Sequence, residues 1–171
     1  MKNFRIEKDT LGKVKVPKEK YWGAQTQRSL ENFNIGSDKM PNELIKSFAI
    51  QKKAAAISNI ALGSLNSRIG KQIIKVCDEI ISGKLYDQFP LSVWQTGSGT
   101  QTNMNLNEVI ANKANKDLGK ELGSYDPIHP NDHCNLSQSS NDSFPTVMHI
   151  TLVKIITENL EPEIKYFIKS I

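Results

Sequence analysis

Two hydroxyl-rich segments of this sequence carry residue types that can bind a small anion. The first runs from Gln95 to Asn103 and reads Gln-Thr-Gly-Ser-Gly-Thr-Gln-Thr-Asn, just before an expected helix. Glycines let backbone N–H groups approach an anion closely, and a helix N-terminus adds the positive end of its dipole. The hydroxyls of Ser98 and Thr100 could donate to a carboxylate or a phosphate. The segment is not a Walker loop, because the Gly-Lys-Ser/Thr ending is absent, and an ordinary surface turn is the alternative.

The second segment, Ser137 to Asp142, again gathers hydroxyls and amides ahead of an expected helix. Helix capping is the simpler interpretation. Ser139, followed three residues later by Asp142, resembles a capping box with Asp in place of Glu. Capping explains one or two of these residues but does not require the whole segment to be polar. The segment therefore remains a second candidate for anion binding.

A third polar segment contains His129, Asp132 and His133, which raises the question of a metal site. Their spacing matches neither the HExxH helix of a zinc protease nor a cysteine–histidine zinc site. A polar loop is therefore favoured, and we expect no metal. Cys77 and Cys134 also lack metal-like spacing, so we expect two reduced thiols.

Helices must position these segments. Apolar residues recur at helical spacing from Pro41 to Gly63 and from about Ser67 to Ser82. A third helix is expected from about Thr102 to Leu118, although its asparagines are weak helix formers and leave only a thin apolar stripe. A hairpin or extended arm is expected in residues 4–16, and a short helix from Ala24 to Phe33.

The last part of the chain should be a loop followed by a long helix. Residues 120–145 are rich in Pro, Asn, Asp and Ser, and the helix is expected from Thr146 with a kink at Pro162. Its apolar stripe continues to Ile171 without a stop signal. We therefore expect a truncated chain, or an ordered part that ends there, which exposes apolar surface or associates.

Composition excludes several classes of protein. The 171 residues suffice for one domain and the start of a second, and no stretch approaches the ~20 apolar residues of a membrane span. The N-terminus lacks an apolar signal run, so a cytoplasmic location is expected. The net charge of +4 belongs to residues 1–20, and the remainder is neutral, which argues against a nucleic-acid-binding surface. Trp22 and Trp94 are expected in the core.

Several strings of residues, taken in order, resemble the class II fumarase family along the whole chain. They are Trp22–Ser29, Trp94–Asn105 with Asn107–Asn112, His129–Asp132 and Ser137–Asp142. The wider superfamily includes aspartases, argininosuccinate lyases and adenylosuccinate lyases. The Thr96–Thr100 string and the pair Ser139-Ser140 look more like a fumarase than an aspartase, which stays the nearest enzyme alternative.

The resemblance implies a mainly α fold. Residues 1–140 would form an N-terminal helical domain with a short hairpin arm, and residues 141–171 would start a long central helix bundle. Four subunits would pool their bundles in a homotetramer, and loops from three subunits would form each active site. The resemblance implies no cofactor and no metal, and the partner would be a small dicarboxylate, fumarate or malate.

The resemblance also implies roles for single residues. Those that match the substrate-binding segments are Ser98, Gly99, Thr100, Ser139, Ser140 and Asn141. Those that match a second dicarboxylate site are His129, Pro130, Asn131 and Asp132. The family often has a basic residue just before this second site. Here Tyr125–Ile128 offers none, so we expect that site to be absent or weaker for anions.

The implied reaction is the reversible hydration of fumarate to L-malate in the tricarboxylic acid cycle. Removing the malate proton leaves a carbanion delocalised into a carboxylate, and fixed hydroxyl and amide donors can stabilise the developing charge. None of the candidate residues is an obvious base. The resemblance places the acid–base residues beyond Ile171, so no catalytic residue is expected here and the chain alone should be inactive. A non-catalytic dicarboxylate-binding fragment is the alternative from another class.

Overall fold

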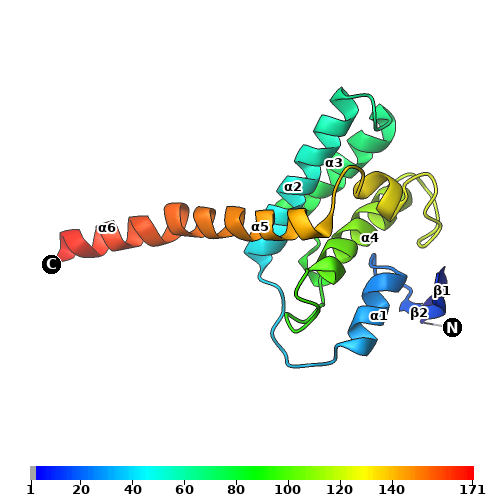
Figure 1. Cartoon of the computed structure of the whole chain (residues 1–171), viewed down its shortest axis with the longest axis horizontal. Coiled ribbons are helices and arrows are strands. Elements are labelled where there is room, and N and C mark those ends of the chain that lie inside the picture. The colour runs from blue at the N-terminus through cyan, green and yellow to red at the C-terminus, as the bar shows by residue number, and fades with distance from the viewer. Residues whose placement is uncertain (1–2) are drawn as a thin grey trace.

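A computed structural model describes residues 3–171 of the chain (Figure 1). It contains a two-stranded antiparallel hairpin and six α-helices with short helical turns between them. The elements are β1 (Phe4–Asp9), β2 (Gly12–Pro17), α1 (Ala24–Asn32), α2 (Asn42–Ala61), α3 (Ser67–Ile81), η1 (Tyr86–Gln88), α4 (Thr100–Asp117), η2 (Pro130–Cys134), α5 (Ser140–Ile155), η3 (Ile156–Leu160) and α6 (Glu161–Ser170). The expected mainly α fold with a hairpin arm is confirmed.

Helices α2, α3 and α4 enclose the core. Asn66 caps α3, because its side-chain oxygen accepts from the backbone N–H groups of Arg68 and Ile69. The apolar face of α3 is buried together with Phe48 of α2, which is fully enclosed. Burying one such side chain contributes roughly 1.5–3 kcal/mol, so this face holds the helix pair together. Both helices lie within two residues of their expected bounds.

Helix α4 runs through the centre of the domain and begins at Thr100, two residues earlier than expected. Its asparagines are buried and bind the backbone of surrounding loops. The amides of Asn105, Asn112 and Asn115 donate to the carbonyls of Gln88, Tyr21 and Ile128 respectively, at 2.8–3.1 Å. These asparagines, which are weak helix formers by themselves, thus stabilise the fold by donating hydrogen bonds to buried loop carbonyls.

Helix α5 begins at Ser140, six residues before the expected start at Thr146. The expected loop 120–145 also contains the π-helical turn η2. Pro145 lies inside α5, where it removes one backbone hydrogen bond, and it made the segment resemble a loop. The cap at Ser139 starts the helix in spite of this proline.

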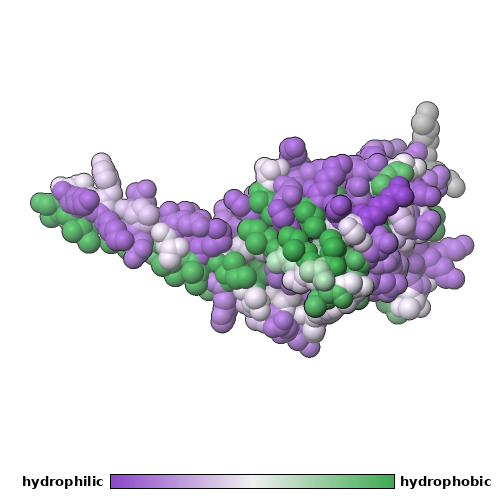
Figure 2. Space-filling view, turned by 90° about the horizontal axis from the view of Figure 1, so that it is seen from above, coloured by the Kyte–Doolittle hydropathy of each residue, from purple (hydrophilic) through white to green (hydrophobic). Residues whose placement is uncertain are grey.

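Helices α5 and α6, joined by the π-helical η3, form one rod that projects from the body of the molecule (Figure 1). Pro162, where a kink was expected, lies in the first turn of α6 directly after η3, and the rod stays helical through it (Figure 1). Figure 2 shows apolar side chains along one edge of the rod. They include Ile164, Phe167 and Ile168, so the expected exposure of apolar surface is confirmed. Within residues 3–171, no helix is long and apolar enough to cross a membrane.

The two tryptophans differ in burial. Trp22 is only 6% exposed, as expected, whereas Trp94 is 57% exposed, so its expected place in the core is wrong. The indole of Trp94 instead lies at the surface against Gly36. Cys77 and Cys134 are free and buried, as expected for two reduced thiols.

Candidate functional site

The two hydroxyl-rich segments meet at the surface, where the N-termini of α4 and α5 come together. The hydroxyl oxygens of Thr100 and Ser140 lie 3.0 Å apart, although they are 40 positions apart in the sequence. The Ser98 hydroxyl lies 3.1 Å from that of Thr100. A continuous line of hydroxyl groups therefore crosses from one loop to the other. We call the six residues Ser98, Gly99, Thr100, Ser139, Ser140 and Asn141 the cradle.

Gly99 lets the first loop approach α5 closely. Its φ is +67°, and a Cβ there would overlap the ring of Phe144. Any other residue would be strained in its backbone and would push the two helices apart. Gln95 completes this end of α4, because its side-chain oxygen accepts from both the N–H and the hydroxyl of Thr102 at 3.0 Å.

Ser139 forms the other side of the cradle and caps α5. Its hydroxyl oxygen accepts from the N–H of Asn141 at 3.3 Å. The expected capping role of Ser139 is confirmed, but the bonded amide is that of Asn141, whereas a capping box would use Asp142. The Ser140 hydroxyl meets that of Thr100, and the Asn141 side chain is exposed at the start of the helix.

The electrostatics of the cradle favour an anion. Helices α4 and α5 have 18 and 16 residues, and both present their N-terminal ends here. The N–H groups of a first helical turn have no acceptor within the helix, and the aligned peptide dipoles make this end positive. Every side-chain donor in the cradle is neutral. The cradle can therefore hold a carboxylate by hydrogen bonds, but it supplies no strong base.

Backbone N–H groups of the polar segment at η2 donate hydrogen bonds to the side chains of its two histidines. The ring nitrogen Nδ1 of His129 accepts from the N–H of Asp132 at 3.3 Å, and Nδ1 of His133 accepts from the N–H of His129 at 2.8 Å. These bonds fit the expected polar loop. In the part of the chain that the structure describes, no three His, Cys, Asp or Glu side chains gather in a way that could hold a metal ion.

A cavity of about 450 Å³ opens beside η2. His129 and Asn131 form one wall, and Lys8 and Thr10 of the hairpin arm form another. Lys8 is a basic residue on the lining of this cavity, and Asp9 lines it as well. The sequence gives little sign of this contact, because the arm lies more than a hundred positions from η2.

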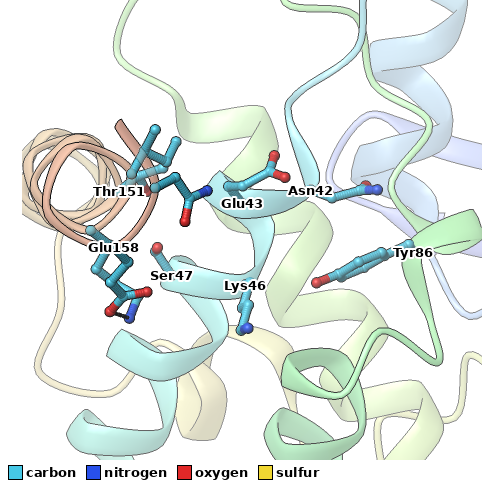
Figure 3. A pocket seen from close by; sticks show the side chains of 10 residues that line it. Asn42, Glu43, Lys46, Ser47, Tyr86, Thr151 and Glu158 are labelled. Atoms are coloured by element: carbon cyan, nitrogen blue, oxygen red, sulfur yellow. Dashed lines mark hydrogen bonds and ion pairs between the residues drawn. The ribbon is translucent and has the colours of Figure 1, made fainter. Parts of the chain in front are cut away.

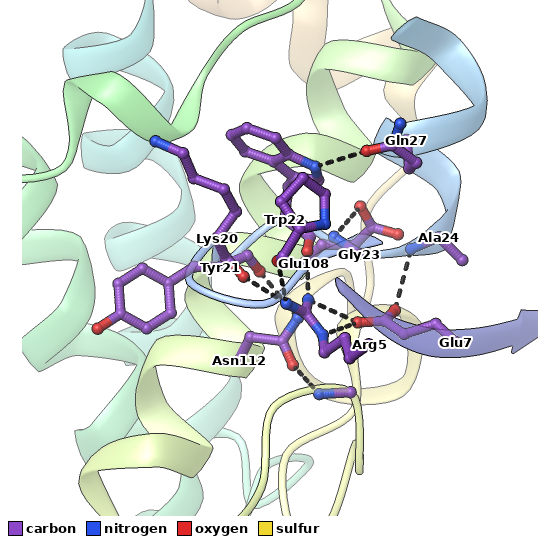
Figure 4. A network of polar contacts seen from close by, with 12 residues as sticks. Arg5, Glu7, Lys20, Tyr21, Trp22, Gly23, Ala24, Gln27, Glu108 and Asn112 are labelled. Carbon is purple, nitrogen blue, oxygen red and sulfur yellow. Dashed lines mark hydrogen bonds and ion pairs between the residues drawn. The ribbon is translucent and has the colours of Figure 1, made fainter. Parts of the chain in front are cut away.

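The buried carboxylate of Glu108, for which the sequence gives no signal, also lines this cavity. Figure 4 shows the hydrogen-bond network around it. Glu108 of α4 is 1% exposed and accepts from the N–H groups of Gly23, Gln25 and Thr26 and from the Thr26 hydroxyl, at 2.6–3.1 Å. Burial raises the pKa of this carboxyl, and the four donors oppose that shift. Glu108 thus caps α1, whose own N-cap residue is a glycine. These four hydrogen bonds give Glu108 a structural role.

Glu7 has a similar role in the hairpin arm. Its carboxylate accepts from the N–H of Ala24 at 3.0 Å and from Arg5 at 2.7 Å (Figure 4). It also accepts from the Tyr125 hydroxyl at 2.6 Å. The arm is thereby connected both to α1 and to the loop that precedes η2.

Another cavity, of about 350 Å³, lies between the start of α2, Tyr86 and the rod (Figure 3). It contains none of the cradle residues. Glu43 and Glu158 offset Lys46 and Lys154 on its walls, so it offers no net positive charge to a diacid. The cradle is the better candidate for anion binding.

Comparison with known proteins gives one consistent result. A family model described as "Lyase" matches residues 12–171. The class II fumarate hydratase of Helicobacter pylori strain 26695 is 58% identical over 98% of this chain and 36% of its own length. That of Bacillus subtilis is 57% identical over 93% of this chain and 34% of its own length. A crystal structure of recombinant class II fumarase from Schistosoma mansoni has a TM-score of 0.93 and 44% identity, covering 97% of this chain and 35% of that one. The chain thus spans about a third of the length of these relatives.

Proposed function

Because the chain belongs to the lyase family whose model covers residues 12–171, we propose that it supplies the N-terminal portion of a class II fumarate hydratase. This enzyme adds water reversibly to fumarate to form L-malate, a step of the tricarboxylic acid cycle. The observation that carries the proposal is the 3.0 Å contact between Thr100 and Ser140. It brings two helix N-termini and their hydroxyl groups to one point, where neutral donors and two positive helix ends suit a carboxylate.

The cradle would bind one carboxylate of the substrate. When the proton next to that carboxylate leaves malate, negative charge accumulates on the carboxylate oxygens. Donors that already point at those oxygens stabilise this charge without reorganising. The proton itself needs a base that the cradle lacks, so the acid–base residues come from other segments of the enzyme.

We extend the proposal to the domains of the chain and to the assembly of its subunits. Residues 1–140 form the lyase domain with the substrate loops, and residues 141–171 start the central bundle. The exposed apolar edge of the rod packs against bundle helices, including those of neighbouring subunits in a homotetramer. A cytoplasmic location fits two cysteines that remain free.

We further assign the second dicarboxylate site to the cavity beside η2. His129, Pro130 and Asn131 line this cavity, and Asp132 belongs to the same turn η2. Lys8 brings a basic residue to the lining, and Asp9 beside it offsets that charge, so the site should bind a dicarboxylate mainly through polar groups.

The test is fumarate hydration by the protein at its full encoded length, followed by ultraviolet absorbance. Ser140→Ala and Thr100→Val should each lower kcat/KM by about 10²-fold, because each removes a donor to developing charge. Ser37→Ala, at an exposed position, is the matched control and should leave kcat/KM unchanged. Residues 1–171 alone should show no turnover.

Two outcomes would contradict the proposal. Full-length protein that releases ammonia from L-aspartate but leaves malate unchanged would favour the aspartase alternative. Full activity of both cradle variants would exclude the cradle as the carboxylate site.

A further inference from the structure

Lys52 of α2 is a charged side chain in the interior of the domain. It is 1% exposed, and its ammonium has one hydrogen-bond acceptor, the side-chain oxygen of Asn135, at 3.0 Å. Across residues 3–171, no carboxylate forms an ion pair with it. The ring centroid of Phe48 lies 5.6 Å from the nitrogen, at cation–π distance, and the Cys134 and Cys77 thiols are the other titratable groups nearby. Burial lowers the pKa of Lys52 to about 7.

Asn135 is the centre of the surrounding cluster. Its side-chain oxygen accepts from Asn103 at 3.0 Å and from Asn107 at 3.3 Å, in addition to Lys52. Its side-chain nitrogen donates to the carbonyl of Gln138 at 3.2 Å. One side chain therefore connects α2, α4 and the loop that leads into α5.

This cluster is connected to both segments of the cradle. Asn103 is in the first turn of α4, where its N–H donates to the carbonyl of Gly99 at 3.0 Å. Gln138 immediately precedes Ser139, and its side-chain oxygen accepts from Gln51 of α2 at 3.2 Å. The two segments of the cradle, at the start of α4 and at the start of α5, are thus both connected by hydrogen bonds to one turn of α2. This turn contains Gln51 and Lys52.

The cluster is costly for stability. A buried ammonium without a carboxylate is destabilising. The side-chain oxygens of Asn103 and Asn107 are also buried without a hydrogen-bond partner among the described residues, which adds to this cost. An apolar core of the same size would be more stable. The arrangement therefore serves something other than stability.

We propose that Lys52 is a positioning residue for the cradle, acting through its hydrogen bond to Asn135. That bond sets the distance between the start of α4 and the start of α5, and so keeps the hydroxyls of Thr100 and Ser140 converged. The kinetic consequence rests on the proposed function, whereas the structural consequence does not.

Lys52→Met tests this, because methionine has a similar length and is apolar but cannot donate. In the full-length protein it should lower kcat/KM for fumarate by about 10-fold or more, because a small displacement of the groups that position the substrate lowers the reaction rate substantially. Its Tm should stay equal or rise, because a buried charge is lost. Lys53→Met is the matched control: Lys53 is the next residue, forms a partly exposed ion pair with Asp78 and should change kcat/KM less than about twofold.

Amide hydrogen exchange gives a readout that does not depend on activity. Exchange at residues 138–142 should accelerate in Lys52→Met and not in Lys53→Met, while α3 stays as protected as before. If the wild-type protein fails to hydrate fumarate, the proposed function fails, and this exchange still decides the role of Lys52. Unchanged exchange, or kcat/KM within twofold of an active wild type, would overturn the inference.

A second variant guards against a misfolded Lys52→Met. Asn135→Leu should reproduce the kinetic loss and the faster exchange. The double variant should lose no more than Asn135→Leu alone, because that change already removes the bond to Lys52 together with the other bonds of Asn135. Additive losses would mean that the two residues act separately and would contradict the proposal.

Discussion

Single buried charges in this chain differ in how completely they are satisfied. Glu108 accepts four hydrogen bonds, and the resulting network fixes α1 against α4. Lys52 has one acceptor and no carboxylate partner among the described residues. A fully bonded charge stabilises a particular geometry, whereas a poorly paired one lowers the total stability. The first fits a structural role, and the second fits our proposed role in positioning.

The cost of burying Lys52 should depend on pH. Its pKa falls from an ordinary value of 10.5 to about 7 in the folded chain. Below about pH 7 both folded and unfolded chains are protonated there, and the full cost is present. Between the two pKa values the unfolded chain binds more protons, so the stability contributed by this site rises with pH.

The stabilisation of Lys52→Met over wild type should therefore be largest at about pH 6 and shrink towards about pH 10. Urea unfolding of both proteins across this range measures it. A difference that is independent of pH would mean that the Lys52 pKa is not lowered.

At the level of elements, the cradle depends on how closely the loop before α4 approaches α5. Gly99 allows this approach, because the ring of Phe144 occupies the space in which a side chain would start. The two helix N-termini could not otherwise present their hydroxyl groups at one point.

Gly99→Ala should destabilise the protein by about 1–3 kcal/mol, through backbone strain and the clash with Phe144. It should also weaken fumarate binding, because the hydroxyls of Thr100 and Ser140 move apart. Gly97→Ala, two residues earlier, is the control, since a Cβ there meets nothing within 4 Å. Thermal unfolding and KM measure the two effects, and equal behaviour of the two variants would contradict the explanation.

The elements that could be predicted from the sequence are those marked by residues close together in the chain. Apolar periodicity located α2 and α3, and the two hydroxyl segments pointed to the helix starts that do converge. The start of α5 was misplaced because Pro145 and its polar neighbours resemble a loop, although the capping pattern at Ser139 already pointed to the earlier start. Glu108 as a cap and Trp94 at the surface could not be predicted, because their surroundings come from residues distant in the sequence.

At the scale of the whole molecule, the rod formed by α5, η3 and α6 departs from the enclosed domain. Ile164 and Ile168 lie on its apolar edge at 47% and 64% exposure. Exposed apolar surface of this kind is a site of association. In the proposed tetramer the same edge becomes part of the shared bundle.

Replacing both Ile164 and Ile168 by Gln should therefore lower the assembly mass measured by light scattering after size exclusion. The matched control replaces Lys165 and Lys169 by Gln, at the same spacing on the same helix. This control should retain the wild-type mass. If the two double variants behave alike, the apolar edge does not drive assembly.

The burial of both cysteines has a practical consequence. Cys77 and Cys134 are the only cysteines of the sequence, and burial raises the pKa of both thiols, to about 12 for Cys134. Reagents that need a thiolate should therefore spare them in the folded protein. A fluorophore or spin probe could be attached to one new surface cysteine, on the rod or at the rim of the cradle, with the native thiols left in place.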